Sequence, residues 1–183
     1  MALTFNGKEV NTVKFNNNVG YIIVGNPTIN DGVVSGFSAS NYYAVSSAFI
    51  DSGEDLELCV TFTTNTIANK PIFGVTNDYN NQRPMLSLHA SGSRVKFKIA
   101  NKVELISGYN ISAGVKYKAI VSRSGTTYTL KLYSGEILLD TKTLTSETLI
   151  GNGASNTFAI GFDRPNYNTG FDNGSIDLNS SYF

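Results

Sequence analysis

The stretch from Val115 to Leu144 alternates apolar and polar residues through three successive runs. A period of two indicates β-strands that bury one face, because successive side chains leave opposite sides of the pleat. Two short turns, Ser122–Gly125 and Tyr133–Gly135, separate the runs, and such short turns join antiparallel neighbours. The stretch therefore predicts a β-meander. One predicted face holds Val115, Tyr117, Ala119, Val121, Tyr128, Leu130 and Leu132, the opposite face holds Lys116, Lys118, Ser122, Thr127, Thr129 and Lys131, and the third run carries Asp140 and Lys142 on one side.

Short runs of strand character also occur along the rest of the chain, and no segment keeps a helical period for more than a turn or two. Many short strands at this spacing are typical of a sandwich, a jelly roll or a barrel. We therefore expect an all-β protein with antiparallel strands. The predicted strands outside the meander are Gly32–Phe37, Tyr42–Val45, Leu56–Phe62, Pro71–Val75, Leu86–Ala90, Val95–Ile99, Phe158–Phe162 and Ile176–Leu178.

Residues 1–25 form a compact group of strand signals of their own. Leu3–Phe5 and Val10–Phe15 flank an Asn-Gly pair, the strongest short signal for a hairpin. A break at Asn26-Pro27 follows. The segment either forms a separate docking hairpin or supplies edge strands to the main fold. We accordingly divide the chain into residues 1–25 and a β-sandwich at 26–183.

Charge and hydropathy restrict the partners. The 183 residues include 14 basic and 14 acidic side chains, a formal net charge of zero, and only 15% are charged. Nucleic-acid binding needs a basic excess, so we expect no nucleic-acid partner. No apolar run approaches the roughly 20 residues that span a bilayer, and no secretory signal is visible, so we expect no membrane insertion. The single cysteine, Cys59, allows no internal disulfide framework.

The order of the segments resembles the concanavalin A-like lectin/glucanase superfamily, in its laminin G-like branch. The resemblance runs from about residue 35 to 183, and it is carried by Tyr42–Val45 with the Asp55–Phe62 strand, the Leu86–Ile99 hairpin, Lys118–Tyr133, and Ala159–Phe162 followed by Asn173–Leu178. The last segment, with Gly174, Ile176, Asp177 and Leu178, is similar to the G-x-I-D-L closing strand of such modules. In addition, Phe5–Val10 resembles segments of minor structural proteins of bacteriophages.

This resemblance implies a two-sheet antiparallel jelly roll. Members of the superfamily bind carbohydrate, some hydrolyse it, and many phage copies decorate capsids or tail fibres, so fold alone does not choose the function. The phage-like segment favours a virion protein assembled in the host cytoplasm. Its expected partners are other virion proteins or further copies of itself, through strand addition by the N-terminal hairpin, and cell-surface glycans.

Glycoside hydrolysis requires two carboxylates flanking the scissile bond. The glucanase branch places them on one strand in an E-x-D-x-x-E pattern, which this sequence lacks. The nearest pair, Asp55 and Glu57, opens a strand opposite Leu56 and Leu58, and a solvated strand start is the simpler interpretation. We therefore expect no enzymatic activity and no catalytic residue.

We expect no cofactor. Calcium, which is bound by carboxylate and amide oxygens, is the alternative left open. Asp163 and Asp172 are its weak candidate ligands, since Asx-rich loops are more often turn formers.

Two polar loops, Asn77–Pro84 and Asp163–Asn173, have the chemistry of a sugar site, because each surrounds a tyrosine with amides, a carboxylate and an arginine. The sequence has no tryptophan, and polar loops without a ligand are the alternative. The predicted carbohydrate-binding residues are Asp78, Tyr79, Asn80, Asn81, Arg83, Asp163, Arg164, Asn166, Tyr167 and Asn168. We thus expect a non-enzymatic virion decoration protein of the capsid or tail with a lectin-like fold. The alternative is a free glycan-binding or glycan-cleaving module.

Overall fold

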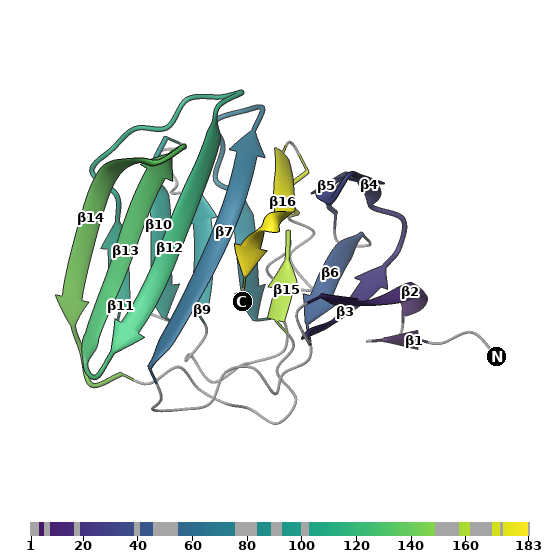
Figure 1. Cartoon of the computed structure of the whole chain (residues 1–183), viewed down its shortest axis with the longest axis horizontal. Coiled ribbons are helices and arrows are strands. Elements are labelled where there is room, and N and C mark those ends of the chain that lie inside the picture. Colours follow the sequence, from purple (N-terminus) through teal and green to yellow (C-terminus); the bar gives the residue numbers. More distant parts are fainter. Residues whose placement is uncertain are drawn as a thin grey trace.

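The computed structural model is a two-layered β-sandwich (Figure 1), and no helix occurs in the part of the chain that it describes. That part comprises all residues except 1–3, 6–7, 17–18, 39–40, 46–54, 76–83, 89–92, 100–102, 149–157, 162–169, 173 and 183. All strand pairs are antiparallel, as the short turns predict. No helix among the described residues has the length and apolarity that crossing a bilayer requires.

One layer is a seven-stranded sheet in the order β14-β13-β12-β7-β16-β5-β4. The predicted meander forms the three strands at one end of this sheet, and the closing strand β16 lies beside β7. Its strands are β4 (Thr28–Asn30), β5 (Val33–Ser35), β7 (Leu56–Thr64), β12 (Lys116–Ser124), β13 (Thr127–Ser134), β14 (Ile137–Thr145) and β16 (Gly174–Tyr182).

The other layer is a nine-stranded sheet in the order β1-β2-β3-β6-β15-β8-β9-β10-β11. Strands β1 to β3 continue this sheet beyond β6, at the opposite end of the molecule from β14 (Figure 1). The division of the chain at residue 26 and the docking role of its first segment stay predictions. The strands are β1 (Thr4–Phe5), β2 (Lys8–Asn16), β3 (Val19–Val24), β6 (Tyr42–Val45), β8 (Pro71–Val75), β9 (Pro84–Leu88), β10 (Val95–Ile99), β11 (Val103–Ile106) and β15 (Phe158–Ile160).

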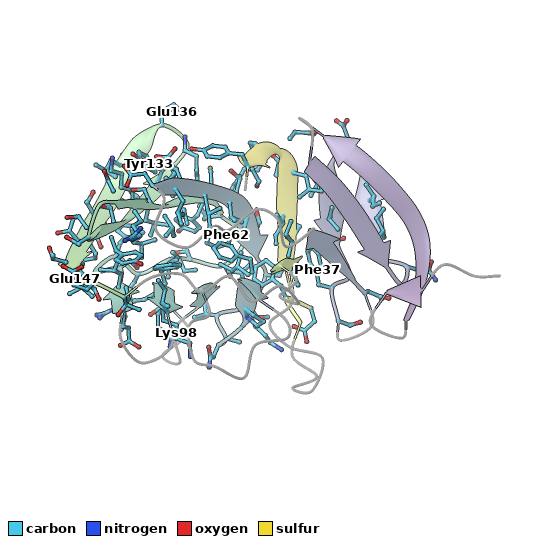
Figure 2. All side chains as sticks on the ribbon, turned by 90° about the horizontal axis from the view of Figure 1, so that it is seen from below. Phe37, Phe62, Lys98, Tyr133, Glu136 and Glu147 are labelled. Carbon is cyan, nitrogen blue, oxygen red and sulfur yellow. The ribbon has the colours of Figure 1, made fainter. Side chains whose placement is uncertain are left out.

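The core lies between the layers and contains the alternate residues of both sheets. Phe37 and Phe62 lie inside the sandwich (Figure 2), each 1% exposed. Phe97 of β10 faces Tyr128 of β13 across the layers, with ring centroids 6.4 Å apart. The inward residues of β7, β12 and β13 are buried, except that Leu56 is partly buried and that Val115 lies outside β12 and is exposed. The remaining inward residues of these three strands are Leu56, Leu58, Val60, Phe62, Tyr117, Ala119, Val121, Tyr128, Leu130 and Leu132.

Arg123 corrects one predicted turn. The sequence places it in the turn Ser122–Gly125, but it is a strand residue of β12 on the inward row, only 6% exposed. Its guanidinium lies 5.7 Å from the centroid of the Tyr128 ring, where the ring face attracts a cation. The turn itself is shorter and has Gly125 at φ 54°, a left-handed conformation that glycine adopts without strain.

Candidate functional site

The candidate site is the outer face of the seven-stranded sheet, meaning the face turned away from the core. It holds the residues that alternate with the core-facing ones on four adjacent strands, β16, β7, β12 and β13. Paired positions give its layout, because Asp177, Thr61, Lys118 and Tyr133 form one row across the strands. The outer-face residues are Glu57, Cys59, Thr61, Thr63, Lys116, Lys118, Ile120, Ser122, Thr129, Lys131, Tyr133, Ser175, Asp177 and Tyr182.

A strap, residues Leu178–Tyr182 of β16, covers part of this face. Asp177 pairs with Thr61 of β7, but the next paired position is Tyr182 with Cys59. Four residues of β16, Leu178–Ser181, therefore lie between paired positions that only Val60 separates on β7, so the register shifts here. Cys59 and Thr61 point away from the core yet are only 1% and 5% exposed, because the strap lies over them. The outer face is thus buried at Cys59 and Thr61, although the alternation of β7 predicts that both side chains are exposed to solvent.

Hydrogen bonds hold the strap onto β7. The Thr61 amide donates to Oγ of Ser181 at 2.9 Å, and the Thr61 hydroxyl donates to the Ser180 carbonyl at 3.0 Å. The Cys59 thiol contacts the same carbonyl at 3.7 Å, within the range for a weak sulfur donor. Burial raises the pKa of the Cys59 thiol to about 11; the Lys118 charge opposes this rise and the Glu57 charge adds to it. The thiol is therefore protonated and enclosed.

Asp177 anchors the start of the strap. Its backbone carbonyl accepts the Ser181 hydroxyl at 2.6 Å, and its carboxylate accepts the Asn179 amide at 3.0 Å. Lys116 of β12 reaches the other carboxylate oxygen at 3.1 Å. Burial by itself would raise the pKa of Asp177, but the bonds from Lys116, Ser180 and Asn179, together with the Lys116 charge, lower it overall. The carboxylate is consequently charged and oriented at neutral pH.

Tyr182 ends the strap and returns an aromatic ring to the surface. Its hydroxyl donates a 2.5 Å hydrogen bond to Oε1 of Glu57, and its residue is 44% exposed. Burial is the largest cause that raises the pKa of Tyr182, and the bond to Glu57 and the charge of Glu57 raise it further. The phenol therefore keeps its proton and fixes the Glu57 carboxylate beside its ring.

Tyr133 supplies a second aromatic ring on β13. Lys118 of β12, its paired neighbour, places its ammonium 5.0 Å from the ring centroid, and it also lies 3.8 Å from the Glu136 carboxylate on the adjoining turn. Figure 2 shows Tyr133 and Glu136 on the seven-stranded side of the sandwich. Three strand spacings, about 14 Å, separate β16 from β13, so the two tyrosine strands bracket a surface wide enough for a short oligosaccharide.

The arrangement has the chemistry of a sugar-binding surface. Tyrosine rings offer apolar faces with a polar tip, and Glu57, Asp177, Lys118 and the hydroxyls of Thr63 and Thr129, which the strap does not bury, offer directed donors and acceptors. Specific binding sites commonly combine an apolar wall with a few placed polar groups. Sequence reasoning missed this face. A signal existed for Tyr133, which lies out of phase with buried Leu130 and Leu132, but none existed for Tyr182.

Asp55, weighed as a catalytic partner of Glu57, holds a turn. Its two carboxylate oxygens accept the Gly125 amide at 2.7 Å and the Ser124 hydroxyl at 2.9 Å. The bond from the Gly125 amide is the largest cause that lowers the pKa of Asp55; the Ser124 bond and the Arg123 charge add to it, and burial opposes it. The carboxylate of Asp55 is therefore committed to the β12–β13 turn rather than to Glu57.

The predicted loop residues lie outside the described part of the chain, so the structure does not bring them together or separate them. They are Asp78, Tyr79, Asn80, Asn81, Arg83, Asp163, Arg164, Asn166, Tyr167 and Asn168. Of the two calcium candidates, Asp163 also lies outside it, and Asp172 forms a 3.0 Å ion pair with Lys70. The described residues contain no group of three or more His, Cys, Asp or Glu side chains placed to hold a metal ion.

Comparison with solved structures identifies the fold. Tailspike protein 2 of bacteriophage CBA120 (enzymatically active domain) superposes with a TM-score of 0.58 at 10% identity, over 93% of this chain and 30% of that one. The LG1–3 region of the laminin α2 chain gives 0.58 at 14%, over 84% and 32%. Domain 4 of an extracellular arabinanase from Geobacillus stearothermophilus, in complex with arabinotriose, gives 0.61 at 13%, over 91% and 86%.

These likenesses confirm the predicted two-sheet, concanavalin A-like jelly roll, and at such identities they show the fold alone. The chain spans about a third of the tailspike domain and of the laminin LG1–3 region. No protein-family model matches the sequence, and no curated protein matches it.

Proposed function

We propose that this chain is a non-enzymatic virion protein of the capsid or tail surface that binds cell-surface glycans on the outer face of its seven-stranded sheet. The observation that carries the proposal is the surface between Tyr182 and Tyr133. Two aromatic rings stand on strands about 14 Å apart, with Glu57 fixed by Tyr182 and Lys118 fixed over Tyr133. Such preoriented polar groups lose little conformational freedom when a neutral, hydroxyl-rich ligand binds.

The carboxylates of this face support binding rather than hydrolysis. Asp177 is paired with Thr61, and Glu57 lies four residues away from Thr61 on β7, about 14 Å along the strand. Glycosidases hold their two carboxyl groups about 5 to 9.5 Å apart. Both carboxylates also have hydrogen-bond partners, Tyr182 for Glu57 and Lys116 for Asp177. Asp55, the remaining partner considered for Glu57, is held by the β12–β13 turn.

Two features support the virion assignment. Phe5–Val10 resembles segments of minor structural proteins of bacteriophages. The fold of 93% of the chain is also similar to that of part of a bacteriophage tailspike protein. In this proposal the protein is assembled in the host cytoplasm, with other virion proteins or further copies of itself as partners, and needs no cofactor.

The competing function is that of a free glycan-binding or glycan-cleaving module. It is favoured by one observation, the similarity to a separate arabinanase domain in complex with arabinotriose, of which this chain spans 86%. Location separates the two functions, because a virion protein co-purifies with particles whereas a free module does not.

The experiment combines a location test with a binding test. Purified particles of the virus that encodes the chain are examined for the protein by peptide mass spectrometry, and the isolated protein is tested against bacterial surface polysaccharides for binding and for release of reducing ends. The proposal predicts the peptides in particles, saturable binding and no release of reducing ends. Absence from particles refutes the virion assignment, and cleavage abolished by Glu57→Gln refutes the non-enzymatic one.

A further inference from the structure

The outermost strand of the seven-stranded sheet, β14, presents a long edge. It has nine residues, pairs with β13 on one side, and ends the strand order on the other (Figure 1). A strand edge carries backbone amides and carbonyls that another strand can pair with. In the described part of the chain, no strand is hydrogen-bonded to this edge of β14.

The hydrogen-bond pattern shows which backbone groups point outward. The Ser146 amide donates to the Thr126 carbonyl at 2.8 Å, so the neighbouring pair Thr127–Thr145 is not directly hydrogen-bonded. The register continues without a shift to the pair Lys131–Thr141, four residues further, which therefore has the same character. The amide and carbonyl of Thr141 consequently point away from β13, toward the open edge.

The residues on either side of Thr141 carry opposite charges. Asp140 and Lys142 lie on the same side of β14, with 3.6 Å between Oδ1 of Asp140 and Nζ of Lys142. Oδ2 of Asp140 also accepts a hydrogen bond of 2.5 Å from the Gly108 amide. Inward charges on an edge strand normally discourage pairing with other strands. Here an acidic residue lies one position before Thr141 and a basic residue one position after it. When two copies of β14 pair antiparallel with Thr141 opposite Thr141, Asp140 of each copy therefore lies opposite Lys142 of the other. Registers centred on Asp140 or on Lys142 instead place identical charges directly opposite each other, which is destabilising.

The start of β14 is apolar and open to solvent. Ile137 is 69% exposed and Leu138 is 51% exposed, the two largest exposures among the large apolar residues of the described chain. The register of β14 against β13 shifts between Asp140 and Leu138, so these two residues lie beyond an irregularity of the strand. A self-pairing centred on Thr141 pairs the charges and brings this apolar start of each strand near the last residues of β14 in the other copy.

We propose that β14 is the contact between two copies of this chain, which pair antiparallel about a two-fold axis at Thr141. Asp140 of each copy faces Lys142 of the other, and the seven-stranded sheets join into one continuous sheet. This inference rests on the proposed function, which has further copies of the chain among its partners, and it names the surface through which two copies associate. Its own readout is molecular mass, and glycan binding and particle incorporation are measured separately, so either can fail without the other.

The test follows mass by sedimentation velocity over a series from about 1 µM to 1 mM protein. Thr141→Pro removes the outward amide of residue 141, which donates to the second copy, and removes no hydrogen bond to β13. It therefore weakens pairing at the edge and leaves the sheet of each copy intact. Asp140→Lys and Lys142→Asp each place like charges opposite each other in a homodimer. Mixed together, the two variants restore both opposite-charge pairs. The control is Lys96→Asp, which makes the same charge change as Lys142→Asp but on β10 of the other sheet. Circular dichroism verifies that each variant is folded.

The expected result is a wild-type dimer that Lys96→Asp preserves. Thr141→Pro and each charge variant alone weaken association at least about tenfold, and the equimolar mixture of Asp140→Lys and Lys142→Asp recovers the dimer. A wild type that stays monomeric throughout the series overturns the proposal. So does a dimer that Thr141→Pro leaves unchanged, or a mixture of folded charge variants that stays monomeric.

Discussion

The hydroxyl of Tyr182 donates a 2.5 Å hydrogen bond to Oε1 of Glu57, across 125 positions of sequence. This bond ties the end of the strap to the opposite end of β7 and leaves the Tyr182 ring 44% exposed. The strap thereby does two things at once, because it buries Cys59 and Thr61 and presents an aromatic ring at the rim of the outer face.

Loss of the Tyr182 ring is expected to expose the only cysteine. With a pKa of about 11 instead of 9.0, the Cys59 thiolate population at pH 8 is about 100-fold below that of a free thiol, and the strap adds a steric barrier. Tyr182→Ala is expected to raise the rate of Cys59 labelling by a disulfide reagent at least about tenfold. Tyr182→Phe, which keeps the ring and removes only the bond to Glu57, gives an intermediate rate. Equal rates in all three proteins contradict the covering role of the strap.

Glycan affinity is expected to depend on the two outer-face tyrosines. Removing one stacking aromatic ring costs about 0.5 to 1.5 kcal/mol, so Tyr133→Ala and Tyr182→Ala each weaken binding about two- to tenfold. The matched control is Tyr109→Ala, since Tyr109 is also exposed at 40% but lies outside the outer face. Titration calorimetry measures the effect. A loss of affinity in the control as large as in the two variants argues for a different binding surface.

Acid is expected to destabilise the fold through Asp55 and Asp177, whose pKa values are both lowered in the folded state. Carboxylates of this kind stabilise fully above their unfolded pKa, near 3.8, and this stabilisation is lost as pH falls through the lower folded pKa. Thermal unfolding midpoints should therefore drop steeply below about pH 4. Asp55→Asn should flatten that drop, and Ser124→Ala, which removes one of the two bonds to Asp55, should flatten it less. Parallel curves for the three proteins contradict the role given to the Asp55 carboxylate.

Alanine substitutions at two glycines separate the effect of core packing from the effect of backbone conformation. Both have positive φ, 76° at Gly161 and 54° at Gly125, so alanine costs about 1 to 2 kcal/mol in backbone strain at either position. A Cβ at Gly161 also meets Cδ1 of buried Phe37 at 2.1 Å, whereas nothing lies within 4 Å at Gly125. Gly161→Ala is expected to destabilise by at least about 3 kcal/mol in urea unfolding, and Gly125→Ala by about 1 to 2. Equal losses contradict the close packing of Phe37 on Gly161.

The sequence predicted the meander because β12 and β13 keep a period of two with one buried face, and short turns join them to each other and to β14. Two strands escaped prediction. All three residues of β4 are exposed, so no alternation marks it, whereas β11 does alternate, with Val103 and Leu105 buried and Glu104 exposed, and this short signal was missed. The closing strand was predicted as Ile176–Leu178 but runs over Gly174–Tyr182. Its extra residues are polar because Ser180 and Ser181 bond to the outer face of β7, and polar residues at the end of a strand resemble a loop.

The outer-face site could be predicted only in part. Tyr133 lies on the side of β13 that otherwise holds threonine and lysine. An aromatic residue on the polar side of a half-buried strand can be recognised in the sequence. The position of Tyr182 depends on the register shift after Asp177, which inserts residues between two paired positions. Such a register shift depends on contacts with Thr61 and Cys59, more than a hundred residues earlier, and local periodicity does not contain them.

The most direct test of the glycan-binding function is a titration of the wild-type protein and of the Tyr133→Ala/Tyr182→Ala double variant with the same bacterial surface polysaccharide, monitored for heat and for reducing ends. The account predicts saturable binding by the wild type without new reducing ends, and binding weakened about 5- to 100-fold in a double variant that is still folded. Release of reducing ends by the wild type contradicts the account, as does equal affinity in the two proteins.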